Sequence, residues 1–177
     1  NMKLFFVFVI FFGTVFNSFS LTLPLAEKAI NSELKKHFAE NKYALSELSV
    51  PTNYAVTGKF YEIKSLAVAS IKYIYAGRVF TTRGANKSTT DAEFFDYIIL
   101  YNAAQTIQKV KIVNLQTSHG EGVASSGWLK QFVGYNSQKQ LTVGKNIDAI
   151  SGATISVNKI TFDIQSKTSI LGQILKQ

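Results

Sequence analysis

Hydrophobic residues recur at helical spacing in two stretches, one toward each end of the chain. In Leu25–Phe38, apolar residues stand three or four positions apart with charged residues between them. This pattern predicts an amphipathic helix with Pro24 near its first turn. The same spacing runs through Ile155–Leu175 and predicts a C-terminal helix that starts close to Thr154. Thr168 is a point at which this second helix can be interrupted.

Between these helices the hydrophobic pattern is typical of strands. Four stretches are rich in aromatic and β-branched residues, and mostly short connections join them, which favours an antiparallel meander over alternating βαβ units. Gly77 marks a position where a hairpin can turn, and the uneven spacing of Ile107, Val110 and Ile112 indicates a β-bulge. The predicted strands are Lys59–Leu66, Ile71–Phe80, Phe94–Tyr101 and Thr106–Leu115, and a polar loop is predicted at Asn86–Thr90.

The part of the chain that follows the strands alternates small loops with short elements. A polar, glycine-containing loop at Thr117–Gly122 leads into Gly127–Phe132, which predicts a short amphipathic helix. A further loop leads to a strand-like piece at Leu141–Val143. The predicted fold class is therefore α+β, with an antiparallel sheet of about four to six strands packed with an N-terminal and a C-terminal helix.

The first twenty residues have the pattern of a secretory signal. The apolar run Leu4–Phe16 follows a short start with Lys3 and precedes the small polar segment Asn17–Ser20. This run is shorter than the roughly 20 residues that a bilayer-spanning helix needs. We expect residues 1–20 to be a signal peptide, with a retained anchor as the alternative. The rest of the chain is then exported to the periplasm or to the extracytoplasmic face of the membrane, and residues 21–177 form one domain.

Composition narrows the chemistry that this chain can carry. Cysteine is absent from its 177 residues, which excludes disulfide scaffolds, iron–sulfur clusters and thiol nucleophiles. Two histidines, His37 and His119, are too few for a poly-histidine site, and no metal is expected. The formal net charge is +8, but the lysines are dispersed and the arginines are only Arg78 and Arg83. This distribution argues against nucleic acid as a partner.

The stretch Asp148–Ser156 (DAISGATIS) carries the most specific chemical signal. Its small residues Ser151–Ala153 let the backbone approach another group closely, and Gly152 can adopt a positive φ angle. Its hydroxyl residues cluster at the predicted helix start, where unpaired N–H groups favour an anion such as phosphate. The alternative is that Ser151 or Thr154 only caps the helix. The stretch matches neither a Walker loop nor the GxGxxG dinucleotide pattern.

Two segments of the chain closely resemble the FMN-binding domain family. They are Trp128–Gly134 and Ile147–Ser156, and the second contains the D-x-x-S/T-G-A-T motif at which that family attaches flavin covalently. Members include the flavin-carrying subunits of the sodium-translocating NADH:quinone reductase and of the Rnf complex, together with small exported FMN-binding proteins. The resemblance covers about the C-terminal third, and upstream of Thr117 it rests on the order of elements. It implies that residues 21–177 are an FMN-binding domain.

The resemblance also implies a cofactor, a maturation step and a role. The Thr154 hydroxyl would form a phosphoester with the 5′-phosphate of FMN, installed by a separate magnesium-dependent flavin transferase that uses FAD as donor. The protein would then act in electron transfer with redox partner proteins, membrane-bound ones among them, and no catalytic residue is assigned. The cofactor-binding residues expected are Thr154, Asp148, Ser151, Gly152, Ala153, Ser156, His119 and Trp128.

One loop of this chain differs in sequence from that of the family. Two residues have alternative roles, and two other functions remain as alternatives. The respiratory-complex subunits carry a Glu-Thr-Pro-Gly type of segment where this chain has Ser118–Gly122. His119 can donate a hydrogen bond to the phosphate or to the flavin pyrimidine, or it can be an exposed loop residue. Trp128 can lie along the isoalloxazine or belong to the core. The alternative functions are a flavin-dependent reductase of a small extracytoplasmic acceptor and a non-catalytic binding module without flavin.

Overall fold

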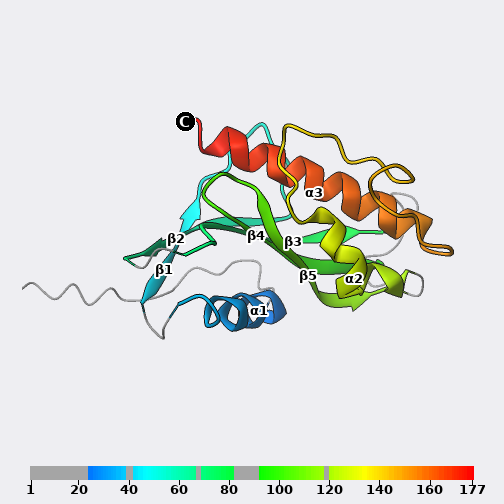
Figure 1. Cartoon of the computed structure of the whole chain (residues 1–177), viewed down its shortest axis with the longest axis horizontal. Coiled ribbons are helices and arrows are strands. Elements are labelled where there is room, and N and C mark those ends of the chain that lie inside the picture. The colour runs from blue at the N-terminus through cyan, green and yellow to red at the C-terminus, as the bar shows by residue number, and fades with distance from the viewer. Residues whose placement is uncertain (1–23, 39–41, 67–68, 82–91, 118–119) are drawn as a thin grey trace, which may run out of the picture.

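A five-stranded antiparallel sheet forms the centre of the protein (Figure 1). The computed structural model describes residues 24–38, 42–66, 69–81, 92–117 and 120–177. Spatial order follows chain order, so each strand pairs with its sequence neighbour and the sheet is a simple meander. The strands are β1 (Tyr43–Leu48), β2 (Gly58–Ser65), β3 (Tyr73–Phe80), β4 (Phe94–Tyr101) and β5 (Ile107–Gln116).

Helices cover both faces of the sheet, which gives three layers (Figure 1). The short helix α1 (Pro24–Leu34) lies on one face, and the long C-terminal helix α3 (Thr154–Ile174) lies on the other. The predicted α+β class, with an antiparallel sheet and a helix at each end, is confirmed. Beside α3 lie the short elements η2 (Glu121–Ala124), α2 (Ser126–Leu129) and η3 (Lys130–Phe132).

Alternation along the central strand β4 explains why both faces must be covered. Tyr97 and Ile99 point into the core beneath α3, while Ile98 and Leu100 point into the core beneath α1. All four are fully buried, as expected of a strand in which only Asp96 interrupts the apolar run. A sheet of this composition is stable only when each face is packed against another layer.

Polar contacts fix the position of α3 on the sheet. The Tyr97 hydroxyl donates to the Asp163 carboxylate at 2.5 Å, and Lys167 Nζ donates to the same carboxylate at 2.7 Å. Burial, and then the charge of Asp163, hold the pKa of Tyr97 well above its usual range. The Tyr101 hydroxyl lies 3.2 Å from Thr168 Oγ1, which itself donates to the Ile164 carbonyl at 2.8 Å. Because these contacts satisfy Thr168 inside the helix, the predicted interruption there is wrong.

A buried carboxylate joins α1 to the edge of the sheet. Glu33 is 2% exposed and accepts hydrogen bonds from Lys109 Nζ at 2.9 Å and from Lys36 Nζ at 3.0 Å. Lys111 Nζ lies 3.6 Å away. Burial alone raises the pKa of Glu33, but the hydrogen bonds and charges of Lys109 and Lys36 outweigh it, so this pKa lies below its ordinary value. The ion cluster therefore stabilises the ionised carboxylate.

The hairpin turn predicted at Gly77 is wrong, because this glycine lies inside β3. It pairs with Gly58 of β2 and with Tyr97 of β4. A Cβ atom at Gly77 would lie 2.0 Å from the hydroxyl oxygen of Tyr75, a residue that is fully buried. Gly77 is therefore required for the space it leaves to an aromatic side chain and not for a turn.

Other local predictions have mixed outcomes. The β-bulge is confirmed, since the register of β4 against β5 shifts at two places. The strand-like piece Leu141–Val143 is reduced to a single bridge between Val143 and Ile147. The edge strand β1 was not predicted. Residues 1–20, with the predicted signal, and the polar loop Asn86–Thr90 lie outside the described residues. Within the described ranges, no helix is long and apolar enough to cross a bilayer.

Candidate functional site

The motif segment forms the entry to α3, and none of its hydroxyls caps the helix. Gly152 has a φ of 77°, in the left-handed region that glycine tolerates best. Ala153 is the N-cap residue and makes no side-chain capping hydrogen bond, and Thr154 is the first helical residue. The first hydrogen bond of the helix runs from the Val157 N–H to the Ala153 carbonyl at 2.9 Å. The N–H groups of the first turn therefore have no acceptor within the helix, and capping by Ser151 or Thr154 is wrong.

A pocket of about 300 Å³ opens beside this helix start. Its volume lies at the lower end of the range found for small-molecule sites. Thr154 itself is exposed, whereas the neighbouring Ala153 and Ser156 are buried. The pocket is lined from the helix side by Gly152, Ala153, Thr154, Ile155 and Ser156, and from the sheet side by Thr81, Glu93 and Thr117.

Strand register brings the three sheet residues together although they are far apart in sequence. Thr81 directly follows β3, Glu93 directly precedes β4, and Thr117 directly follows β5. In an antiparallel meander these three positions share one end of the sheet. The Thr81 N–H donates to the Glu93 carbonyl at 2.8 Å, which continues the ladder past the last paired strand residues. None of these residues was predicted as part of the site, although polar residues at adjacent strand ends were a usable signal.

The hydroxyl of Thr81 is the unusual group in this pocket. The residue is 3% exposed, and its Oγ1 has no hydrogen-bond partner within the part of the chain that the structure describes. Buried hydroxyls are nearly always paired, because burial without a partner costs free energy. Because it lines a pocket, the Thr81 hydroxyl is placed to form a hydrogen bond with a polar atom of a molecule bound there.

Two glycines at η2, Gly120 and Gly122, lie close to the motif segment and the first turn of α3. Gly120 has a φ of 99°, and a Cβ atom there would lie 2.6 Å from Ser156 Oγ. A Cβ atom at Gly122 would lie 3.1 Å from the Ile150 side chain. Only glycine fits these two close approaches without a shift of the neighbour. His119 and Ser118 lie outside the described residues, so the roles predicted for His119 stay predictions.

Trp128 belongs to the core and holds the backbone of the motif segment through a hydrogen bond. The residue is 9% exposed and its ring packs edge-on against Phe132, with centroids 5.3 Å apart. Its Nε1–H donates to the Asp148 carbonyl at 2.9 Å, and the Asp148 N–H donates to Gln131 Oε1 at 2.8 Å. The Asp148 side chain is exposed and does not line the pocket. These two hydrogen bonds hold the backbone of the motif, which favours the core interpretation of Trp128.

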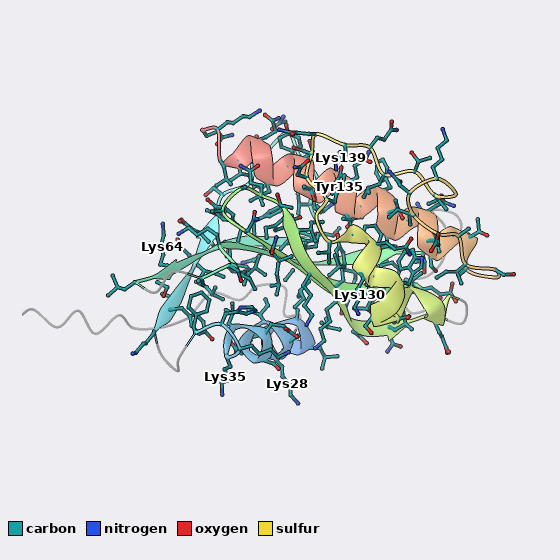
Figure 2. The ribbon with its side chains drawn as sticks, viewed as in Figure 1. Lys28, Lys35, Lys64, Lys130, Tyr135 and Lys139 are labelled. Atoms are coloured by element: carbon teal, nitrogen blue, oxygen red, sulfur yellow. The ribbon has the colours of Figure 1, made fainter. Side chains whose placement is uncertain are left out.

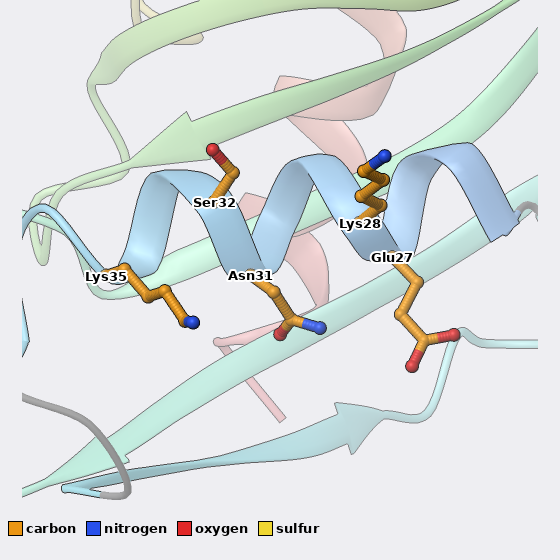
Figure 3. Close-up of a pocket in the computed structure, with 5 residues that line it drawn as sticks. All are labelled: Glu27, Lys28, Asn31, Ser32 and Lys35. Carbon is orange, nitrogen blue, oxygen red and sulfur yellow. The ribbon is translucent and has the colours of Figure 1, made fainter.

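A second hollow lies along α1, and its lining residues do not indicate a particular class of ligand. Its volume is about 570 Å³, and all of its lining side chains are exposed and come from α1 or from Lys35 directly after it (Figure 3). Acidic, basic and neutral groups are mixed there, so they do not converge on a ligand of one charge. The lining residues are Glu27, Lys28, Asn31, Ser32 and Lys35.

The lysines are spread over several elements of the described structure. Figure 2 shows Lys28 on α1, Lys35 directly after α1, Lys64 on β2, Lys130 next to α2, and Lys139 in the loop that follows. These five cations do not form a stripe along one element. A stripe or patch of that kind is the usual electrostatic feature of nucleic-acid-binding surfaces.

The pocket by Thr154 can hold a phosphate-bearing ligand. The helix start offers N–H groups and the positive end of the helix dipole, and both favour an anion. Thr154 adds an exposed hydroxyl at the first helical position, and the sheet side adds the buried Thr81 hydroxyl. In the described ranges, no group of three or more His, Asp or Glu side chains is arranged to hold a metal ion.

Comparison with known proteins gave one match. Residues 95–166 match the family model described as the FMN-binding domain. This match supports the FMN-binding domain family. The matched stretch starts at the second residue of β4 and ends within α3, so it includes the whole motif segment and leaves Thr81 outside. Comparisons with curated proteins and with solved structures found no match. The match thus supports the expected cofactor, FMN.

Proposed function

We propose that this protein is a flavoprotein that carries FMN covalently through Thr154 and acts in electron transfer. The observation that carries the proposal is the chemistry of the α3 start. Thr154 presents an exposed hydroxyl at the first helical position, next to a pocket at which a phosphate would be stabilised. The match of residues 95–166 to the FMN-binding domain supports flavin as the group that this pocket receives.

The exposed geometry of Thr154 suits modification by a second protein. Attachment would form a bond between Thr154 Oγ1 and the FMN phosphorus of FAD while the pyrophosphate bond breaks. AMP would leave, and the hydroxyl proton would pass to a base of the flavin transferase. Gly152, two residues before, has no heavy atom within 4 Å of the place where a Cβ would stand. This open approach supports access by a transferase.

Electron transfer is favoured over reduction of a small substrate because the pocket is small. A volume of about 300 Å³ accommodates part of one cofactor and leaves little room for a second molecule beside it. A flavin anchored at an exposed residue can exchange electrons with redox partner proteins at its exposed side. The flavin would supply the redox chemistry, while the protein anchors its phosphate and shields one end.

Export is part of the same proposal. The apolar run Leu4–Phe16 with its basic start supports a secretory signal, and a covalent bond would prevent loss of the cofactor outside the cytoplasm. Redox partners would then be extracytoplasmic or membrane-bound proteins. Intact mass of the protein recovered from its native compartment tests this directly, because cleavage near Ser20 would remove the predicted signal. A mass that retains residues 1–20 would favour the anchored alternative.

The attachment site is tested by coexpression with a flavin transferase and FAD. We expect flavin fluorescence in a denaturing gel and a mass increase of one FMN phosphoester for the unaltered protein and for Ser169→Ala, which changes an exposed α3 serine that does not line the pocket. We expect neither signal for Thr154→Ala. The Thr154 side chain has no hydrogen-bond partner among the described residues, so this substitution removes the hydroxyl without removing a fold contact. A fluorescent Thr154→Ala band would refute the proposal.

A further inference from the structure

The Thr81 hydroxyl is buried, unpaired and placed in the pocket wall. Its Oγ1 has no hydrogen-bond partner in the described part of the chain, while the N–H of the same residue is held by the Glu93 carbonyl at 2.8 Å. The backbone is thus fixed by the sheet and only the side chain lacks a partner. In the protein without ligand this arrangement costs stability, since a methyl group in the same place would not need a partner.

We propose that Thr81 is a ligand-binding residue whose hydroxyl forms a hydrogen bond with an oxygen of the phosphate–ribityl chain of FMN. The inference rests on the proposed attachment at Thr154. Thr81 and Thr154 line one pocket of about 300 Å³, so the parts of FMN nearest to the attachment atom are those within reach of Thr81. These parts are phosphate oxygens and ribityl hydroxyls, all of which form hydrogen bonds. Thr81 lies outside the matched stretch 95–166.

The chain provides a matched control for this proposal. Thr161 in α3 is 4% exposed, and its Oγ1 is likewise buried and without a partner among the described residues. It does not line the pocket. Replacement of either threonine by valine exchanges an unpaired hydroxyl for a methyl group of similar size. Only the Thr81 substitution removes a group that the cofactor would use.

The experiment compares thermal unfolding of flavin-free and flavin-loaded protein. The four proteins are the unaltered chain, Thr81→Val, Thr81→Ser and Thr161→Val, each produced with and without the transferase and FAD. In the flavin-free form, we expect both valine substitutions to raise the melting temperature by roughly 2–4 °C. In the loaded form, Thr161→Val keeps this increase, whereas Thr81→Val loses it or falls below the unaltered protein. Thr81→Ser, which retains the hydroxyl, keeps the full gain in melting temperature on loading.

The outcomes separate this inference from the proposed function. If the unaltered protein is loaded and Thr81→Val gains as much melting temperature on loading as Thr161→Val does, the role of Thr81 is refuted and attachment stands. If the unaltered protein takes up no flavin although the transferase is active on another substrate, both proposals fall together. A loaded Thr81→Val protein with a reduced gain and an unchanged flavin absorption spectrum supports contact with the phosphate–ribityl chain. A shifted spectrum with an unchanged gain contradicts it.

Discussion

Gly152 has two properties that substitutions can test separately. It adopts a backbone conformation that favours glycine, and it leaves open space beside the pocket. Its φ of 77° lies in the left-handed region, and no heavy atom lies within 4 Å of the place where a Cβ would stand. Gly152→Ala therefore introduces backbone strain without a steric clash. Gly144 is a matched control, since it has a φ of 83°, is also exposed and also has open space where a Cβ would stand. It lies outside the pocket lining.

The expected cost in stability is the same for both substitutions. An L-residue in the left-handed region costs about 1–2 kcal/mol, and the lower entropy of alanine in the unfolded chain returns part of this. We expect a net loss of about 1 kcal/mol in the free energy of unfolding, which corresponds to a fall of roughly 2–4 °C in melting temperature. Urea unfolding of the flavin-free proteins measures it. Gly152→Asn should cost less than Gly152→Ala, because asparagine tolerates this region better.

The expected effect on flavin attachment differs between the two glycines. Gly152 lines the pocket two residues before Thr154, so an added methyl group would reduce the open space beside the proposed attachment residue. We expect Gly152→Ala to slow attachment on the order of tenfold or more, because small displacements of reacting groups are costly. Gly144→Ala should load at the rate of the unaltered protein. Equal loading rates for the three proteins would refute the access argument, and a much larger stability loss at Gly152 than at Gly144 would refute the open-space argument.

Two further predictions concern the scaffold. Glu33→Gln removes the ion pair with Lys109 and should lower the free energy of unfolding by about 1–3 kcal/mol at neutral pH. Because the folded-state pKa of Glu33 lies below its ordinary value of 4.5, its contribution is fully present above that value and is lost as the pH falls through the folded pKa. Urea unfolding across this range should give a flatter acid limb for Glu33→Gln, and parallel limbs would contradict the assignment. Gly77→Ala forces a Cβ to within 2.0 Å of the Tyr75 hydroxyl oxygen and should cost roughly 1–3 kcal/mol, partly restored by Tyr75→Phe. Urea unfolding equal to that of the unaltered protein would show that Tyr75 can move aside.

The central layers of the fold were predictable because their sequence patterns are strong. Apart from Asp96, β4 is apolar on both faces, and α3 has regular helical spacing over 21 residues. The edge strand β1 was not predictable in this way. It is only half-buried on its inner face, and its alternation breaks at Ser46 and Glu47, which are both exposed. Edge strands carry few residues that must be apolar, so they leave a weak signal.

Gly77 shows where local sequence reasoning fails. A glycine within an aromatic stretch is equally consistent with a turn and with a close approach inside a strand. The difference depends on Tyr75, whose hydroxyl lies over Gly77, and on the neighbouring strands that keep Tyr75 buried. Such information resides in the tertiary packing. A glycine two residues from a tyrosine in a strand is a pattern that points to it, because both then lie on the same face.

The helix side of the candidate site was predictable from the sequence. The sheet side was not, because the register of the paired strands assembles it. The helix side is one continuous segment, so Thr154 and its neighbours could be recognised together. The sheet side assembles Thr81 and Glu93 from either side of a connection and Thr117 from the end of another strand. Only the pairing of β3, β4 and β5 places these residues at one end of the sheet. Once a meander is predicted, polar residues at alternate strand ends become candidates for one site.

The identity of the N-cap residue distinguishes helix capping from ligand binding at the start of α3. A hydroxyl caps a helix only from the N-cap residue, where its oxygen can accept an N–H of the first turn. The hydroxyls of the motif stand at Ser151, outside the helix, and at Thr154, already inside it, and Ala153 occupies the N-cap itself. The motif therefore places hydroxyl groups near the helix start but not at the N-cap residue, from which a hydroxyl could cap the helix. The N–H groups of the first turn therefore have no side-chain acceptor from the N-cap residue and can bind an anion in the pocket, as the proposed attachment of FMN requires.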